Sequence, residues 1–259
     1  MMPVRIRRRV LLAVMITITA GLLVGDVVAL GDEPGPASAG GSSRLALPLW
    51  GARVILVLAG LAGWFWTQSL IARRSFPLGR IGDGLHLLSA PLNALLHGRP
   101  RWTNALLIST SALIDLLGIF LLASAIFGPT MRPFLGLLVL YALRQICQGL
   151  CALPPPDGMI WRYPGFPSLL VTYGTSTDLF FSGHTAVAAY GAIELARAGG
   201  QWLVLGVLIV AIEAATVLIL RAHYTMDVFA ALVTALSVAA LAAAIAPGFD
   251  EALAWLVRG

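Results

Sequence analysis

Long apolar stretches alternate with short polar connections along the chain. Seven apolar runs, most of them near the ~20 residues that cross a bilayer as a helix, are separated by segments rich in arginine, glycine and proline. Each run predicts a membrane-spanning helix. The seven runs are Val10–Leu30, Trp50–Ala72, Asn104–Phe127, Met131–Leu150, Ser182–Ala198, Gln201–Leu220 and Thr225–Ala246.

None of these runs shows the alternation of apolar and polar residues that is typical of a membrane barrel strand. Because backbone amides in hydrocarbon must be satisfied within their own segment, a helix is the remaining structure for each run. The predicted fold class is therefore all-α. We expect a polytopic transmembrane helix bundle with six core helices and an extra N-terminal helix.

The N-terminal run has some features of a secretory signal, because arginines precede Val10 and the small residues Ala37-Ser38-Ala39 follow the run. The run from Val10 to Leu30 comprises 21 residues, however, which exceeds the ~7–15 residues of a signal core. We therefore expect a retained helix followed by an exposed loop. The chain is divided into an N-terminal part, residues 1–48, and a membrane-embedded domain, residues 49–259.

Residues 73–103 form the first of two longer polar connections. Their central part, around Leu85–Leu96, predicts an amphipathic segment at the membrane interface. His86 and His97 flank this segment and are expected on its polar face, not as ligands.

The second long connection, residues 151–181, opens with Leu153-Pro154-Pro155-Pro156, which stops the preceding helix. It also carries Trp161, Arg162 and Tyr163, residues suited to a headgroup interface or a polar substrate. A loop of this length between membrane helices is often functional.

Composition agrees with a lipid environment, because 59% of the residues are hydrophobic and 11% are charged, against about a quarter charged in soluble domains. The net charge is +5, but all 17 basic residues are arginines, and most of them lie in the connections, which indicates membrane topology rather than a nucleic-acid partner. Cys147 and Cys151 are four positions apart and match neither a redox motif nor a zinc site.

Two of the four histidines lie where a predicted helix begins. His184 ends the segment Asp178-Leu179-Phe180-Phe181-Ser182-Gly183-His184, and His223 lies in Arg221-Ala222-His223-Tyr224-Thr225-Met226-Asp227. Ser182 predicts a helix N-cap, so that the free amides of the next turn would face a bound phosphate. Since successive helices alternate in direction, both histidines are expected on one side of the membrane.

His223 and Asp227 are four positions apart and share one face of a helix. The carboxylate can hold one ring nitrogen of His223 and leave the other as a nucleophile. His184 would protonate the departing oxygen, while Arg144 or Arg221 would supply charge to the phosphoryl oxygens. These residue types predict a phosphoryl-transfer centre.

The motifs Phe181-Ser182-Gly183-His184-Thr185, preceded by Asp178, and His223-Tyr224-Thr225-x-Asp227-Val228 resemble those of the sphingomyelin synthase-related family. This family is a branch of the superfamily that includes the type 2 phosphatidic acid phosphatases. The stretch from Arg144 to Pro156 is similar to an upstream segment of the family, and the resemblance covers roughly Ile81 to Ala246.

The resemblance implies that His223 is the nucleophile, His184 the general acid and base, and Asp227 the orienting carboxylate. It implies transfer of a phosphorylated headgroup from a glycerophospholipid to a lipid alcohol such as ceramide, through a phosphohistidine. No cofactor or metal is expected. The residues predicted to bind substrate are Arg144, Asp178, Ser182, Gly183, Arg221 and Tyr224.

Two other functions fit the sequence. With water as the acceptor, the same residues would make a lipid phosphatase or phospholipase. A non-enzymatic transporter or scaffold would instead use Asp115 and Glu213, acids in the middle of apolar runs. For these two acids we favour interhelical hydrogen bonding over a proton or ion pathway.

The expected location is a membrane of the bacterial inner type. Counted over seven helices, the arginines lie mostly on the side of the histidines, which indicates a cytoplasmic active site. The resemblance implies an exoplasmic one. The sequence is compatible with both sides. We favour the exoplasmic side for the active site, because the long proline- and aromatic-rich loop suits it.

Overall fold

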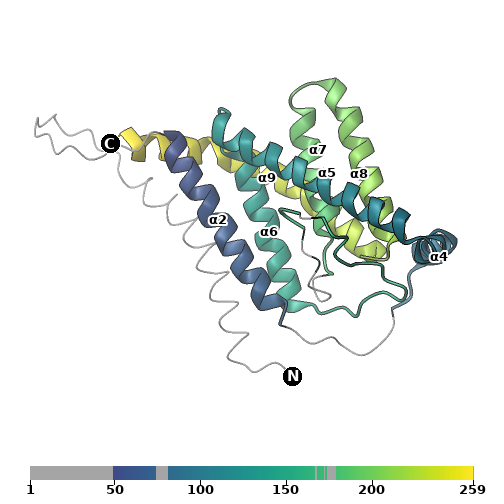
Figure 1. Cartoon of the computed structure of the whole chain (residues 1–259). Helices are drawn as coiled ribbons and strands as arrows, with labels where there is room; N and C mark the ends of the chain where they lie inside the picture. Colours follow the sequence, from purple (N-terminus) through teal and green to yellow (C-terminus); the bar gives the residue numbers. More distant parts are fainter. Residues whose placement is uncertain (1–48, 74–80, 167, 172, 174–178, 259) are drawn as a thin grey trace, which may run out of the picture.

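The computed structural model describes residues 49–73, 81–166, 168–171, 173 and 179–258. These residues form helices and connecting loops without a strand, which confirms the all-α fold (Figure 1). The predicted helix Val10–Leu30 lies outside the described residues, as does the rest of the N-terminal part. Its retention and the division of the chain at residue 48 stay predictions.

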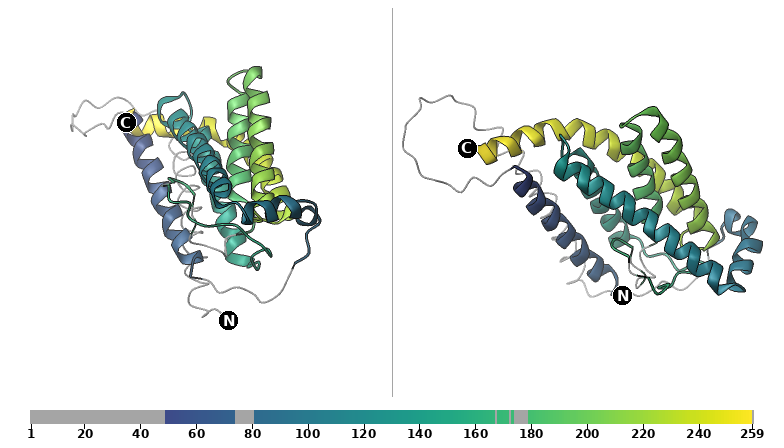
Figure 2. Two further views of the ribbon diagram at one scale, coloured as in Figure 1. Left: turned by 45° about the vertical axis from the view of Figure 1, so that its right-hand side comes forward. Right: turned by 45° about the horizontal axis from the view of Figure 1, so that its top comes forward.

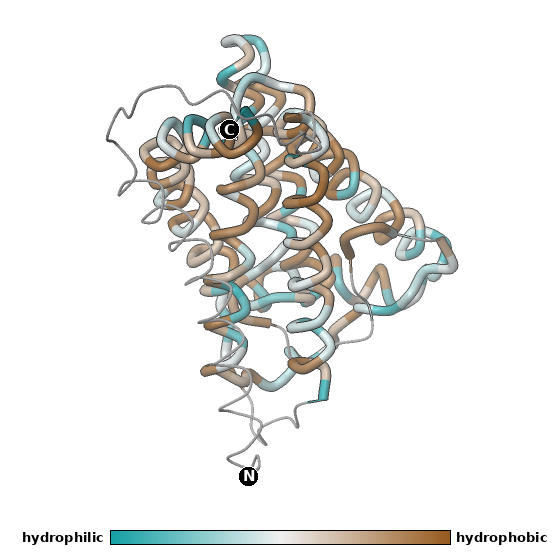
Figure 3. The backbone as a smooth tube through the Cα atoms, turned by 90° about the vertical axis from the view of Figure 1, so that its left-hand side faces the viewer, coloured by the Kyte–Doolittle hydropathy of each residue, from teal (hydrophilic) through white to brown (hydrophobic). Residues whose placement is uncertain are grey.

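Six of the seven predicted runs lie in the described part, and all six are helical. They are α2 (Leu49–Ile71), α5 (Pro100–Phe127), α6 (Arg132–Leu150), α7 (Gly183–Ala196), α8 (Gly200–Ile219) and α9 (Thr225–Arg258). Five of them, all except α7, are long and apolar enough to cross a membrane. Apolar residues follow the helices through most of their length (Figure 3), so the protein is an integral membrane protein.

Helix α7 is shorter than the predicted run Ser182–Ala198, because Ser182 caps its start and it ends at Ala196. Its 14 residues extend for about 21 Å, less than the ~30 Å hydrocarbon layer. Most of its side chains are buried, since α7 packs against α5, α6, α8 and α9. Neighbouring helices therefore shield α7 from lipid.

Helix α9 is longer than predicted. It continues past the expected end at Ala246 and through Pro247, a residue type that commonly ends a helix, to Arg258. Beyond the proline, the Asp250 carboxylate accepts a hydrogen bond from the Met131 amide at 2.8 Å, which ties α9 to the turn between α5 and α6. Figure 2 shows α9 curving across one end of the bundle.

The predicted interfacial segment forms two short helices, α3 (Gly84–Leu88) and α4 (Ala90–His97). They contact α8 and α9 at the end of the bundle where α9 begins (Figure 1). His97 is exposed, as expected. The prediction was wrong for His86, which is buried because α3 packs its side chain against the start of α9.

Helices α7 and α8 form an antiparallel hairpin (Figure 1). A Cβ added to Gly206 of α8 would lie 2.8 Å from the Ala192 Cβ of α7, so glycine permits this close approach. Because the chain leaves and returns along this hairpin, the start of α7 and the start of α9 lie at the same end. This confirms that His184 and His223 share one side.

Candidate active site

Both histidines line one narrow pocket, together with Arg144 and Gly183. The pocket encloses about 40 Å³, room for a few water molecules. Four residues that were predicted separately from the sequence are thus brought together. The remaining wall is mostly aromatic and aliphatic and is formed by Trp64, Ile114, Tyr141, Met159, Trp161, Leu170, Val171, Leu179 and Ala222.

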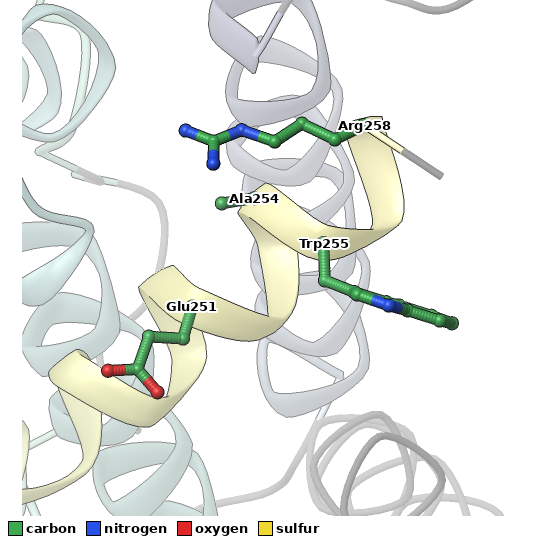
Figure 4. Close-up of a pocket in the computed structure, with 4 residues that line it drawn as sticks. All are labelled: Glu251, Ala254, Trp255 and Arg258. Carbon is green, nitrogen blue, oxygen red and sulfur yellow. The ribbon is translucent and has the colours of Figure 1, made fainter. Parts of the chain in front are cut away.

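A larger, open hollow of about 480 Å³ lies near the C-terminal end of α9. It is lined by Glu251, Ala254, Trp255 and Arg258, all from one helix (Figure 4). None of the predicted site residues lines it, so volume alone does not identify the reactive centre.

The ring of His223 is held by a backbone carbonyl. Its Nδ1 lies 2.8 Å from the Leu179 oxygen. Because a carbonyl oxygen only accepts hydrogen bonds, Nδ1 carries the proton and donates it, which leaves the lone pair on Nε2. A backbone carbonyl has no signature in the residue types, so the sequence did not reveal this partner.

Asp227 stands beside the same nitrogen. Its Oδ2 lies 3.6 Å from Nδ1 of His223 and accepts a 2.8 Å hydrogen bond from the Tyr224 amide. The carboxylate is buried, and its Oδ1 has no hydrogen-bond partner among the described residues. Asp227 therefore closes the first turn of α9 and places a negative charge near the ring, while Leu179 makes the direct contact.

His184 lies in the first turn of α7. The Ser182 side chain accepts hydrogen bonds from the Thr185 amide at 3.3 Å and the Thr185 hydroxyl at 3.1 Å, which confirms the predicted N-cap. The His184 ring meets Trp161 edge-on, with centroids 5.1 Å apart. Its Nε2 is buried without a hydrogen-bond partner in the described part of the chain, so this nitrogen is available to a substrate.

Arg144 does not reach out to the membrane surface. Its side chain is buried, and its Nε donates a 3.0 Å hydrogen bond to the Phe181 carbonyl. A Cβ on Gly183 would lie 3.1 Å from that Nε. The guanidinium therefore lies directly against the start of α7, and glycine at 183 leaves space for it.

Arg221 and Tyr224 do not line the pocket. Arg221 donates hydrogen bonds to the carbonyls of Asp157 and His86, and the Tyr224 hydroxyl donates to the Pro154 carbonyl at 3.0 Å. Both side chains therefore fix the loops around His223, and their contact with substrate stays a prediction. Asp178 lies outside the described residues.

The two intramembrane acids have structural partners. Thr110 of α5 donates a hydrogen bond to Glu213 of α8, in line with the interhelical role that we favoured for this acid. Asp115 accepts 2.8 Å hydrogen bonds from the amides of Leu169 and Leu170, so it holds the long loop rather than a second helix.

Within the described residues, no three His, Cys, Asp or Glu side chains gather as a metal site. The expectation of a metal-free site stays a prediction.

The comparison with known families decides the class of protein. A family model, AtPDCT1/2, matches residues 83–244, more than half of the chain. The chain belongs to the AtPDCT1/2 family. This is a family of lipid phosphotransferases, phosphatidylcholine:diacylglycerol cholinephosphotransferase-like, so the protein is a membrane enzyme of that general kind. No curated protein and no solved structure matches the chain.

The AtPDCT1/2 match includes both histidines and Asp227 but begins after α2, which contributes Trp64 to the pocket. Membership confirms the predicted lipid phosphotransferase. It does not confirm the sphingomyelin synthase-related branch or the ceramide acceptor. The family name points to plants and gives no support to a membrane of the bacterial inner type.

Proposed function

We propose that the protein transfers phosphocholine between lipids through a covalent intermediate on His223. The observation that carries the proposal is the 2.8 Å contact between Nδ1 of His223 and the Leu179 carbonyl oxygen. The Nδ1 proton is held by this carbonyl, which leaves a nucleophilic Nε2 in a pocket shared with His184 and Arg144.

In the first half-reaction, Nε2 of His223 attacks the phosphorus of phosphatidylcholine. The bond between phosphorus and the diacylglycerol oxygen breaks, and His184, which acts in its doubly protonated form, gives its Nε2 proton to that oxygen and becomes neutral. Arg144 and the amides at the start of α7 stabilise the negative charge on the phosphoryl oxygens. Diacylglycerol leaves, and phosphocholine stays bonded to His223.

In the second half-reaction, His184 removes the proton of an acceptor hydroxyl, which then attacks phosphorus. The bond between phosphorus and Nε2 breaks, and His223 returns to its starting form. Diacylglycerol, which the family description names, is the acceptor we propose ahead of ceramide. The same chemistry with water would release free phosphocholine.

Three aromatic side chains support choline as the headgroup. Trp64, Tyr141 and Trp161 all line the pocket, and the rings of Trp64 and Tyr141 are 4.6 Å apart. Aromatic faces attract quaternary ammonium groups. The zwitterionic headgroup would therefore place its phosphate at Arg144 and the histidines and its trimethylammonium group at these rings.

The test is a transfer assay with purified protein in lipid vesicles. Phosphatidylcholine labelled in its choline group is supplied with unlabelled diacylglycerol or ceramide of a distinct chain length. We expect label in new phosphatidylcholine of the acceptor's chain length and a slower reaction with a phosphatidylethanolamine donor. Label that appears only as free phosphocholine would instead establish a phospholipase.

Two histidine variants accompany this assay. His223→Ala should abolish transfer, because no other group replaces the nucleophile. His97→Ala is the matched control, since His97 is exposed and does not line the pocket, and it should retain transfer. Full activity in His223→Ala would disprove the phosphohistidine mechanism.

A further inference from the structure

Helix α3 makes direct contact with the backbone of His223. Nε2 of His86 lies 2.9 Å from the His223 carbonyl oxygen, and His86 is buried. Because that oxygen only accepts, the His86 Nε2 carries a proton and donates it. The His223 residue is therefore held at two points, its ring by Leu179 and its carbonyl by His86.

His86 also contacts the neighbours of His223. Its ring stacks on the ring of Tyr224, with centroids 5.7 Å apart and planes 28° apart. Its carbonyl accepts a 3.2 Å hydrogen bond from Arg221. One residue of α3 thus touches three positions of the segment that joins α8 to α9.

Asp83 fixes the start of α3 and the start of α9 together. Its Oδ1 caps α3 by accepting from the Leu85 and His86 amides, at 3.0 and 3.2 Å. Both oxygens also accept from Thr225, one from its hydroxyl and one from its amide, each at 2.6 Å. Burial raises the pKa of Asp83, but the Thr225 and His86 hydrogen bonds outweigh this and hold the pKa below its usual value.

The segment between α8 and α9 needs this support. His223 lies outside both helices, which end at Ile219 and begin at Thr225, so regular helical hydrogen bonding does not fix it. A misplacement of about 1 Å in a reacting group can cost about 100-fold in rate.

We propose that His86, held in place by Asp83, is a positioning residue that sets the location of the nucleophile His223. The proposal rests on the proposed function, because it takes His223 as the nucleophile. His86 does not line the pocket and acts through His223, so its loss affects the chemical step rather than substrate binding. The family match begins at Asp83 and therefore includes the whole arrangement.

The test compares His86→Ala with His86→Gln in the transfer assay, with kcat and KM measured separately. The alanine variant should lower kcat about 10- to 100-fold with little change in KM. The glutamine variant should recover most of kcat, because its side-chain amide can donate to the same carbonyl. Wild-type kcat in His86→Ala would overturn the proposal, as would equal kcat in the alanine and glutamine variants.

Asn93→Ala is the matched control for general damage to this region. Asn93 is buried on α4 and donates to the carbonyls of Gly158 and Ile219, at 3.1 and 2.9 Å, without touching His223. It should keep kcat near wild type, and an equal loss in Asn93→Ala would overturn the proposal. If His86→Ala fails to fold, Thr225→Val tests the same arrangement, because it removes one Asp83 hydrogen bond and should also lower kcat.

His223→Ala, run in parallel, separates this proposal from the proposed function. An inactive His223→Ala together with wild-type kcat in His86→Ala would overturn the positioning role alone. An active His223→Ala would overturn both.

Discussion

In the proposed mechanism, the proton on Nδ1 of His223 determines which ring nitrogen attacks phosphorus. The Leu179 carbonyl, at 2.8 Å, fixes that proton, whereas Asp227 lies 3.6 Å away and is hydrogen-bonded to the Tyr224 amide. At the residue scale, one residue therefore orients the His223 ring and another places a charge beside it. Leu179 orients the ring, and in the proposed mechanism Asp227 contributes the charge that stabilises a positive imidazolium.

Asp227→Asn tests this division. An amide oxygen can still accept from the Tyr224 amide, and Leu179 still fixes the tautomer, so only the charge is lost. We expect kcat to fall about 10- to 100-fold, less than the ~10⁴-fold loss seen where an aspartate alone sets the histidine tautomer. The measurement is kcat in the transfer assay, and a folded Asp227→Asn variant as inactive as His223→Ala would contradict this account.

Gly183→Ala tests the position of Arg144. The new Cβ would lie 3.1 Å from Nε and 3.3 Å from Cζ of Arg144, so the buried guanidinium must shift from the place where we propose that it contacts phosphate. We expect transfer to fall about 10-fold, since misaligned charge stabilises the transition state less. Gly200→Ala is the control, because Gly200 also begins a helix but has no atom near its added Cβ. Equal activities in the two variants would contradict the assigned role of Arg144.

The sequence predicted the candidate reactive side chains but not what holds them. His184, His223 and Asp227 stand in recognisable motifs, and Ser182 has the residue type of an N-cap. The contacts with Leu179 and His86 cross more than 40 positions and use backbone carbonyls. No residue pattern encodes such a contact, so the structure was needed to find it.

At the scale of elements, α7 is central because it carries His184 and packs against the helix that carries Arg144. Apolar runs predicted six of the described helices, of which five are long and apolar enough to cross a membrane. The ends of α7 and α9 were predicted less well, because they depend on the Ser182 cap and on tertiary contacts beyond Pro247. The contact between α6 and α7 depends on Gly136, where an added Cβ would lie 2.0 Å from the Tyr190 hydroxyl.

Gly136→Ala should therefore destabilise the bundle. Tyr190 is buried and its hydroxyl donates to the Arg132 carbonyl at 2.9 Å, so it cannot move away freely. We expect a loss of about 1–3 kcal/mol in the free energy of unfolding, as for an overpacked core. Thermal unfolding in detergent measures it. Gly63→Ala on α2 has no neighbour near the added Cβ and should not be destabilised, and equal losses in both variants would contradict the packing.

At the scale of the whole molecule, the helix order places the starts of α7 and α9 at one end of the bundle and the turn between α7 and α8 at the other (Figure 1). Helix α2 lies outside the family match, but its Trp64 forms part of the pocket wall. The arginine distribution indicates a cytoplasmic side for the histidines, whereas the family resemblance implies an exoplasmic one.

Cysteine labelling tests the whole-molecule arrangement. Cys151 is exposed at the end of α6, where the long connection of residues 151–181 begins, and a Gly200→Cys substitution would report the opposite end. Both variants carry Cys147→Ser. The variant labelled at position 200 also lacks Cys151, so that each protein has a single cysteine. A membrane-impermeant maleimide should label one of them in sealed vesicles and the other after the vesicles are opened. Labelling of both cysteines from the same side would contradict the arrangement. Labelling of Cys151 from outside right-side-out vesicles would support an exoplasmic active site.

The most direct test of the central claim is to isolate the covalent intermediate. The protein is incubated with phosphatidylcholine labelled in its headgroup, quenched in base, because phosphohistidine is acid-labile, and digested for peptide mapping. We predict labelled phosphocholine on the peptide that contains His223, lost in acid and discharged when diacylglycerol is added. Active enzyme that carries no such adduct, or an adduct that persists in His223→Ala, would contradict the account.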